Sequence, residues 1–163
     1  MSKPPETKPP EIDLLIAREF SAPVALVFRL WESRDHMIRW WGPEQFTAIE
    51  LDWALIPGRA WRGAMTSKQY GLSRFSGTIR EVEKDKRIVF TFKWDEDSGS
   101  DSDTVVTVGF AEKDGNTVQT FHQTPFADAE ARDSHIGGWN SLFNKQQLYA
   151  ENIAVAEQKG IRT

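Results

Sequence analysis

The sequence predicts an α+β fold in which a curved antiparallel sheet of about seven strands wraps around one long C-terminal helix. The helix is predicted by an aromatic and aliphatic stripe at spacings of three, four and seven residues, which runs from near Ser134 to about Gln158. Its members are Trp139, Leu142, Phe143, Tyr149, Ala150 and Ile153. The sheet is predicted by the strand-like alternation of most of the chain before this helix, and its antiparallel pairing by short turns between consecutive strands.

The N-terminal third contains two short helices after a first strand. Residues 1–11 hold four prolines and alternating charges, so we expect a disordered tail, followed by a single domain over 12–163. Residues 12–20 form the first expected strand, and the turn after it leads into a helix over 24–31. Ser33 is the expected N-cap of a second helix over 34–38, which Trp40-Trp41-Gly42-Pro43 ends.

Six further strands are expected before the last helix. The clearest covers 87–94, because Ile88, Phe90, Phe92 and Trp94 alternate onto one face. The Asp114-Gly115 pair predicts a tight hairpin between the last two strands. The expected strands cover residues 46–53, 59–66, 75–82, 87–94, 104–110 and 117–123.

Composition excludes several function classes. A net charge of −4 is not that of a nucleic-acid-binding protein, which needs clustered Lys and Arg. The chain has no cysteine, and hence no thiolate nucleophile and no Cys-ligated metal, and no cofactor is expected. No apolar run approaches the ~20 residues of a membrane span, and the N-terminus lacks the apolar core of a signal peptide. We therefore expect a cytoplasmic protein, and the sequence leaves a homodimer open.

Several motifs together resemble one known family. Glu19-Phe20-Ser21-Ala22-Pro23, then Trp40-Trp41-Gly42-Pro43, then Gly138-Trp139 occur in order at domain-wide spacing. Over about residues 14–153 this resembles the activator of heat-shock-protein ATPase homologue-like family, of the START/birch-pollen-allergen-like (SRPBCC) superfamily. The resemblance implies a helix-grip fold with a cavity between sheet and helix. Superfamily members bind lipids, sterols, hormones or polyketides, and some catalyse cyclisation.

The chaperone activity in the family name belongs to a eukaryotic branch with an extra N-terminal domain. This chain lacks room for that domain, so we do not expect a chaperone partner. The family register also places Gln119, Phe121 and Gln123 on one face of the last strand.

A wall for a ligand cavity follows from the expected strand faces and the helix stripe, with an expected entrance at Trp40, Trp41 and Phe46. Its candidates are aromatic or aliphatic, with two amides among them. Gln146 lies on the apolar stripe of the helix, where an amide needs a hydrogen-bonding partner. The candidate ligand-binding residues are Trp40, Trp41, Phe46, Phe90, Phe92, Trp94, Val108, Phe110, Phe121, Gln123, Trp139, Phe143 and Gln146.

Other chemistry has weaker support in the sequence. The histidines are spaced too far apart for a metal cluster, and we expect His135 to precede the long helix, where it caps the helix or contacts the sheet. The acidic loop over 95–103 does not match a calcium-binding loop. Glu50, Asp52 and Tyr70 are candidates for acid–base chemistry, but the alternation of 46–53 sends both carboxylates outward.

Three functions therefore stay open. The leading hypothesis is binding of a small apolar or amphipathic molecule between sheet and helix, with aromatic contacts and with Gln123 and Gln146 orienting it. The second is a cavity enzyme of the polyketide cyclase or aromatase type, which requires titratable groups in the cavity. The third is a chaperone-linked or regulatory interaction module with a filled core, which an exposed apolar patch near Trp40 and Trp41 would favour.

Overall fold

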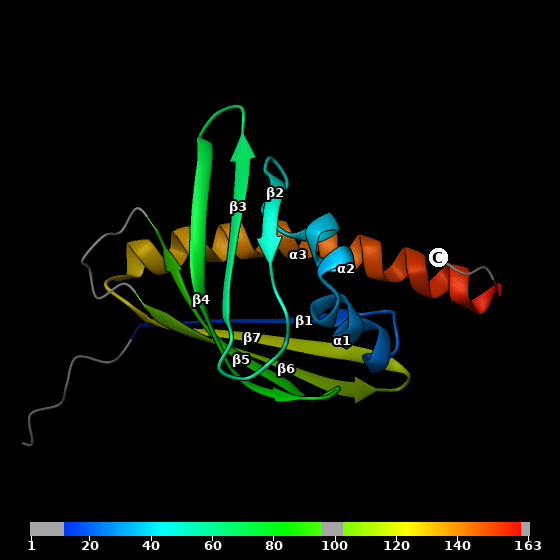
Figure 1. Cartoon of the computed structure of the whole chain (residues 1–163). Coiled ribbons are helices and arrows are strands. Elements are labelled where there is room, and N and C mark those ends of the chain that lie inside the picture. The colour runs from blue at the N-terminus through cyan, green and yellow to red at the C-terminus, as the bar shows by residue number, and fades with distance from the viewer. Residues whose placement is uncertain (1–11, 96–102, 161–163) are drawn as a thin grey trace, which may run out of the picture.

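The computed structural model describes residues 12–95 and 103–160, and the expected tail over 1–11 and most of the acidic loop lie outside them. Within this part the chain forms seven strands and three helices (Figure 1). In chain order they are β1 (Ile12–Phe20), α1 (Val24–Glu32), α2 (Arg34–Trp40), β2 (Thr47–Asp52), β3 (Ala60–Ser67), β4 (Gly71–Glu83), β5 (Arg87–Trp94), β6 (Thr104–Lys113), β7 (Asn116–Phe126) and α3 (Ala129–Gln158).

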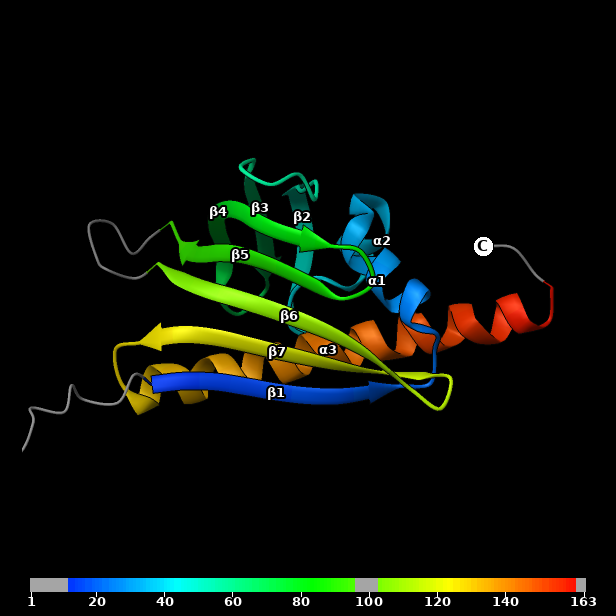
Figure 2. The ribbon, with the colours of Figure 1, turned by 90° about the horizontal axis from the view of Figure 1, so that it is seen from below.

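The strands form one antiparallel sheet in the order β1-β7-β6-β5-β4-β3-β2. Strands β1, β7, β6 and β5 lie side by side in this order, as the view from below shows (Figure 2). Strands β2, β3 and the first half of β4 stand across α3 (Figure 1). The sheet thus curves around the helix, which confirms the predicted fold class. The organisation into a tail and one domain stays a prediction.

The sheet bends along β4 (Figure 1), and Gly77 lies at the middle of this strand. The pairing of β4 with β5 skips Gly77 and Thr78, between Ser76↔Lys93 and Ile79↔Phe90, and its register shifts just beyond, between Ile79 and Glu81. In the gap the main-chain oxygen of Thr91 accepts a hydrogen bond of 2.8 Å from the Trp61 indole nitrogen. A Cβ atom on Gly77 would lie 1.8 Å from that oxygen and 2.6 Å from the indole nitrogen. Only glycine therefore lets the Trp61 side chain fill the bend.

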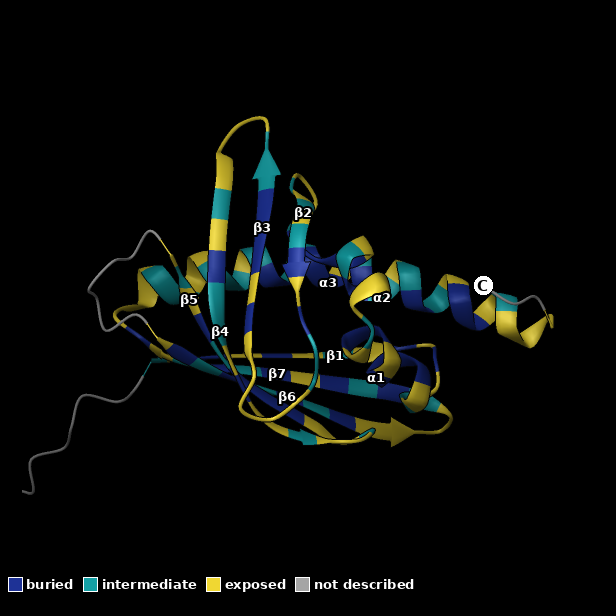
Figure 3. Cartoon of the chain, in the orientation of Figure 1, coloured by how far each residue is buried: buried dark blue, intermediate teal, exposed yellow. Residues whose placement is uncertain are grey.

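An aromatic cluster fills the space that the bent sheet encloses. The Trp31 ring lies 5.0 Å from that of Trp40 and 6.3 Å from that of Phe90, and its side chain is fully buried. Its main-chain oxygen also accepts a hydrogen bond from the Trp53 indole. Figure 3 shows buried and exposed residues alternating along the strands, as expected for a sheet with one solvated face. Helix α1 and the loop after β2 are thus joined to the same core.

Helix α3 begins five residues before the predicted start, at Ala129 instead of Ser134. The reason is its N-cap, because the side chain of Asp128 accepts a hydrogen bond from the Ala131 N–H. His135 therefore lies inside the helix, and the expectation that it precedes or caps it is wrong. Ser33 caps α2 as predicted, accepting a hydrogen bond from the His36 N–H. Strand β4 also starts earlier than expected, at Gly71.

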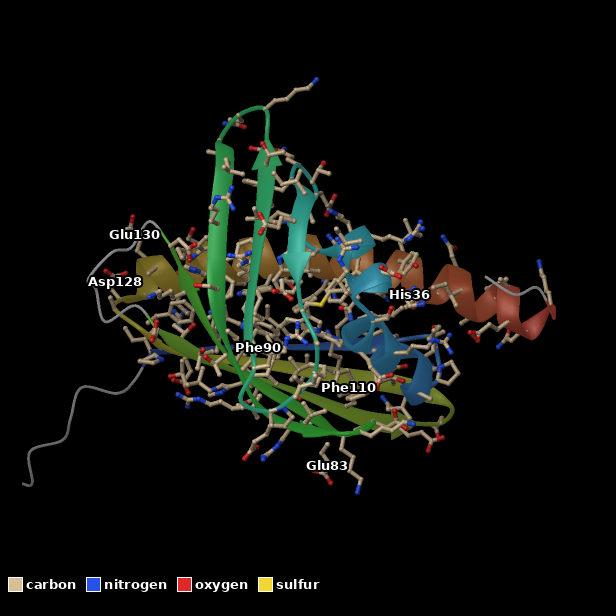
Figure 4. The ribbon with its side chains drawn as sticks, in the orientation of Figure 1. His36, Glu83, Phe90, Phe110, Asp128 and Glu130 are labelled. Atoms are coloured by element: carbon tan, nitrogen blue, oxygen red, sulfur yellow. The ribbon has the colours of Figure 1, made fainter. Side chains whose placement is uncertain are left out.

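A histidine–tyrosine contact joins α2 to α3. The His36 Nδ1 atom lies 2.7 Å from the Tyr149 hydroxyl, and Figure 4 shows His36 on α2 close to α3. Burial first, and then the charges of Arg29 and Arg39, lower the pKa of His36 below its ordinary value. Burial raises the pKa of Tyr149. The contact is therefore built for a neutral imidazole.

We predict that Gly77→Ala destabilises the protein by roughly 3 kcal/mol, since the new methyl group must push β4 and β5 apart. Gly137→Ala is the matched control, because a Cβ atom at Gly137 meets nothing within 4 Å and alanine favours a helix interior by about 0.5–1 kcal/mol. Urea denaturation of both variants checks this. Equal stability of the two variants would contradict the role of Gly77.

The His36 contact predicts a pH-dependent stability difference between the wild type and His36→Asn, which keeps a polar group but cannot titrate. The unfolded chain binds a proton at His36 near pH 6.5, whereas the folded chain binds it only at lower pH. The contribution of His36 to the free energy of unfolding is thus complete above about pH 6.5 and is lost as the pH falls below this value. Denaturation of both proteins between about pH 5 and pH 8 measures the difference, and a pH-independent difference would refute the assignment.

Candidate functional site

A pocket of about 250 Å³ opens between the N-terminal half of α3 and strands β3 to β5. The α2–β2 loop forms its third wall. Among the residues that the structure describes, most of those that line it are aromatic or aliphatic. They are Trp41, Gly42, Pro43, Met65, Phe75, Phe92, Trp94, Ser134, His135, Gly138, Trp139 and Leu142.

The walls of the pocket are aromatic rings from separate elements in mutual contact. The ring of Phe92 on β5 lies 5.7 Å from both Phe75 on β4 and Trp139 on α3. The Trp94 ring is perpendicular to that of Phe92 at 5.1 Å. Such edge-to-face contacts hold large rings in fixed orientations. The pocket therefore offers flat, rigid apolar surfaces to a ligand.

His135 is the one titratable residue among the described residues of the lining, and both of its ring nitrogens are engaged. Its Nε2 atom accepts a hydrogen bond of 3.0 Å from the Trp94 indole. Since Nε2 accepts, the proton lies on Nδ1, which donates to the main-chain oxygen of Ala131 at 2.8 Å. The ring is thus a neutral tautomer that ties α3 to β5. This is the contact with the sheet that the sequence suggested as one role for His135.

A lysine on α3 holds the α2–β2 loop in place. The Lys145 Nζ atom donates to the main-chain oxygens of Trp41, Gly42 and Phe46 at 3.5, 3.1 and 3.4 Å. Burial lowers the pKa of Lys145. These oxygens lie just beyond the C-terminus of α2, so the ammonium group also compensates the negative end of the helix dipole. The wall of the pocket that contains Trp41 and Gly42 is thereby fixed to α3.

Four of the thirteen predicted ligand-binding residues line the pocket, namely Trp41, Phe92, Trp94 and Trp139. They come from three different elements, as the wrapped sheet requires. Their role in binding stays a prediction.

The other nine predicted residues lie elsewhere. Phe46 is partly exposed on the α2–β2 loop, with its ring stacked on that of Tyr70. Phe90 and Phe110 lie within the packed interior, toward α1 (Figure 4), and Phe110 contacts Phe28 at 5.4 Å. The remaining six are also buried away from the pocket lining: Trp40, Val108, Phe121, Gln123, Phe143 and Gln146.

The two amides that were expected to orient a ligand are bonded within the protein. Gln146 exchanges two hydrogen bonds with Gln119 on β7, at 2.8 and 3.1 Å. Gln123 accepts from the Trp139 indole at 2.7 Å and donates to the Thr104 hydroxyl at 2.8 Å. The partner that an amide at Gln146 required is therefore a protein side chain. The predicted face of Gln119, Phe121 and Gln123 is confirmed, since all three are buried.

Sequence reasoning missed eight lining residues. Ser134, Gly138 and Leu142 are four residues apart and so share one stripe of α3, but only Leu142 belongs to the predicted apolar stripe, which marks buried residues and not an open space. Met65 and Phe75 lie outside the strand faces that are predicted to line the cavity. Gly42 and Pro43 indicate only a helix stop in the sequence.

The candidate acid–base residues lie outside the pocket. Glu50 pairs with Arg62 and Arg74, and Asp52 with Arg59, all on the solvated side of the sheet. Both carboxylates thus point outward, as expected, and Tyr70 is 65% exposed. Within residues 12–95 and 103–160 no cluster of His, Asp and Glu could hold a metal ion. None of the helices in this part of the chain is long and apolar enough to cross a membrane.

Solved structures share this fold. A protein from Chromobacterium violaceum is 23% identical, with a TM-score of 0.78 over 85% of this chain and 96% of that chain. A protein from Silicibacter pomeroyi is also 23% identical, with a TM-score of 0.76 over 84% and 96%. A third, from Mycobacterium smegmatis, has 23% identity and a TM-score of 0.72 over 86% and 89%. Identities this low show the fold alone. No curated protein matches the chain.

The family model described as "Activator of Hsp90 ATPase homolog 1-like protein" matches residues 21–151. This range contains α1, α2, strands β2 to β7 and the whole pocket lining. The chain therefore belongs to the Activator of Hsp90 ATPase homolog 1-like protein family.

Proposed function

We propose that the chain binds a small, neutral, apolar molecule in the pocket between α3 and strands β3 to β5. The observation that carries this proposal is an open space of about 250 Å³ walled by aromatic rings beside a closely packed core. Filled cores leave few voids larger than a water molecule. A space of this size is therefore a candidate binding site.

The size of the pocket limits the ligand. Pockets for drug-sized molecules usually measure about 300–1,000 Å³, so this one suits a molecule at the small end, with one or two fused rings. The rigid walls formed by Phe92, Trp94 and Trp139 favour a flat molecule over a flexible chain.

The chemistry of the lining limits the charge of the ligand. The described residues of the lining include no Lys, Arg, Asp or Glu, and His135 is held as a neutral ring. A charged group that left water for this pocket would find no counter-charge, which costs several kcal/mol. A neutral ligand therefore fits best. The family supports the proposal in general terms, because this fold usually binds hydrophobic ligands.

The two alternative functions have less support. A cavity enzyme needs titratable groups that face its substrate, and His135, the sole candidate among the lining residues that the structure describes, is engaged at both nitrogens. An interaction module would be favoured by an exposed apolar patch near Trp40 and Trp41. The side chains of Trp40 and Trp41 themselves are only 0% and 2% exposed. A cytoplasmic location and a homodimer stay predictions.

The proposal predicts that Ser134→Phe blocks the pocket. Ser134 is exposed at the rim and lies one turn before Gly138, so a phenyl ring there extends over the opening without disturbing the core. We expect the affinity for prodan, a neutral naphthalene dye whose emission reports polarity, to fall by about tenfold or more, because the ligand loses most of its buried surface.

Asp133→Phe is the matched control, since the neighbouring residue is exposed but does not line the pocket. It adds the same ring to the same helix and should bind the dye as the wild type does. Dye titration gives the affinities, and thermal unfolding confirms that both variants are folded. Wild-type affinity in Ser134→Phe would reject the pocket as the binding site.

A further inference from the structure

The tryptophans differ in how their indole N–H groups are satisfied. The chain has seven tryptophans, and within the described residues six of their indole nitrogens donate to a protein acceptor. The donors are Trp31, Trp40, Trp53, Trp61, Trp94 and Trp139, at 2.6–3.3 Å. Trp41 alone has no acceptor in this part of the chain. A buried donor without a partner costs about 1–3 kcal/mol, so this exception needs an explanation.

The surroundings of the Trp41 ring, as far as the structure describes them, are mainly aromatic. The residue is 2% exposed, and its ring lies among other aromatic rings, those of Trp61, Phe75 and Trp139 at 5.6–6.1 Å. Among the described side chains, the only fully enclosed polar atom without a partner is Asp85 Oδ1. The Trp41 nitrogen is therefore not sealed by protein atoms. Trp41 lines the pocket, which is an open space next to its ring.

We infer that the Trp41 indole N–H is the hydrogen-bond donor of this pocket, and that the ligand carries a neutral acceptor, such as a carbonyl oxygen, on its small ring system. This inference rests on the proposed function and adds the polar group that such a ligand must have. Apolar walls with one fixed donor are typical of sites that orient a small molecule.

The other polar groups of the lining support an acceptor instead of a donor or an anion. The Nε2 atom of His135 already accepts from Trp94, so a ligand hydroxyl would displace that bond. The hydroxyl of Ser134 is at the exposed rim. One neutral indole donor compensates the burial of a carbonyl, but not the desolvation of a carboxylate. The pocket is thus matched to a neutral ligand with an acceptor at its inner end.

Two probes of the same ring system separate this inference from apolar binding alone. The first is 1-indanone, which has a carbonyl group, and the second is indane, which lacks it. Their dissociation constants are measured by NMR titration with the wild type, Trp41→Phe and Trp94→Phe. Both variants remove one indole from the lining and keep an aromatic ring, but the Trp94 donor is already bonded to His135.

Trp41→Phe should weaken the binding of 1-indanone by about tenfold, because the buried carbonyl loses its hydrogen-bond donor. It should change the affinity for indane by less than about twofold, whereas Trp94→Phe should change both probes by the same factor. Equal effects of Trp41→Phe on both probes would overturn the inference and leave the proposed function intact. Failure of both probes to bind the wild type would overturn the two together.

A second readout needs only the wild type, in case Trp41→Phe does not fold. Hydrogen bonding to a carbonyl moves an indole proton downfield in the NMR spectrum. Saturation with 1-indanone should therefore move the Trp41 indole proton downfield, and indane should not. A Trp41 signal that responds alike to both probes would overturn the inference.

Discussion

Two buried hydrogen-bonded contacts between β7 and α3 set the register of the long helix on the sheet, on which the core and the pocket depend. The first joins Gln119 to Gln146, and the second joins Gln123 to Trp139. They are four residues apart on the strand, about 13 Å, and seven apart on the helix, about 10 Å, so both form at only one register of α3. Apolar packing alone would tolerate a shift along the helix axis. An amide that lost its partner in this interior would not, because each unsatisfied group costs about 1–3 kcal/mol.

That register places an aromatic core under one half of α3 and a pocket under the other. Around Trp31 the rings fill the space and the side chains are fully buried. At the other half, Gly138 replaces a side chain on the face of α3 toward the pocket. A Cβ atom there would meet only Pro43, at 3.8 Å, so sterics alone do not demand glycine. Glycine in a helix interior costs about 1 kcal/mol relative to alanine. A ligand that occupies the space beside Gly138 would account for this cost.

Much of the architecture follows from local pattern. The alternation of Ile88, Phe90 and Phe92 fixed the face of β5, and the stripe from Trp139 to Ile153 fixed the buried face of α3. The bend at Gly77 was not predictable, because it depends on Trp61 reaching the carbonyl of a strand thirty residues away. The start of α3 was missed because the cap comes from Asp128, ahead of any apolar stripe.

The site was only partly predictable for a related reason. Periodicity identifies which side chains face the interior, and it predicts Phe92, Trp94 and Trp139, whereas Trp41 is predicted from its place at the expected entrance. It does not identify which part of the interior stays empty, since that depends on the volumes of side chains brought together by the fold. It also cannot show that Gln146 is satisfied by Gln119, or that Trp41 has no acceptor among the described residues, because both depend on tertiary partners.

The seven indole groups provide the most direct test of the account, since they report on both halves of the interior. The measurement is a ¹H–¹⁵N correlation spectrum of the indole groups during titration with naphthalene, which is neutral and apolar. The account predicts that the largest shifts occur at Trp41, Trp94 and Trp139, which line the pocket, and that Trp31, Trp40 and Trp53 stay nearly unchanged. Larger shifts at Trp31, Trp40 and Trp53, or no shifts at saturating naphthalene, would contradict it.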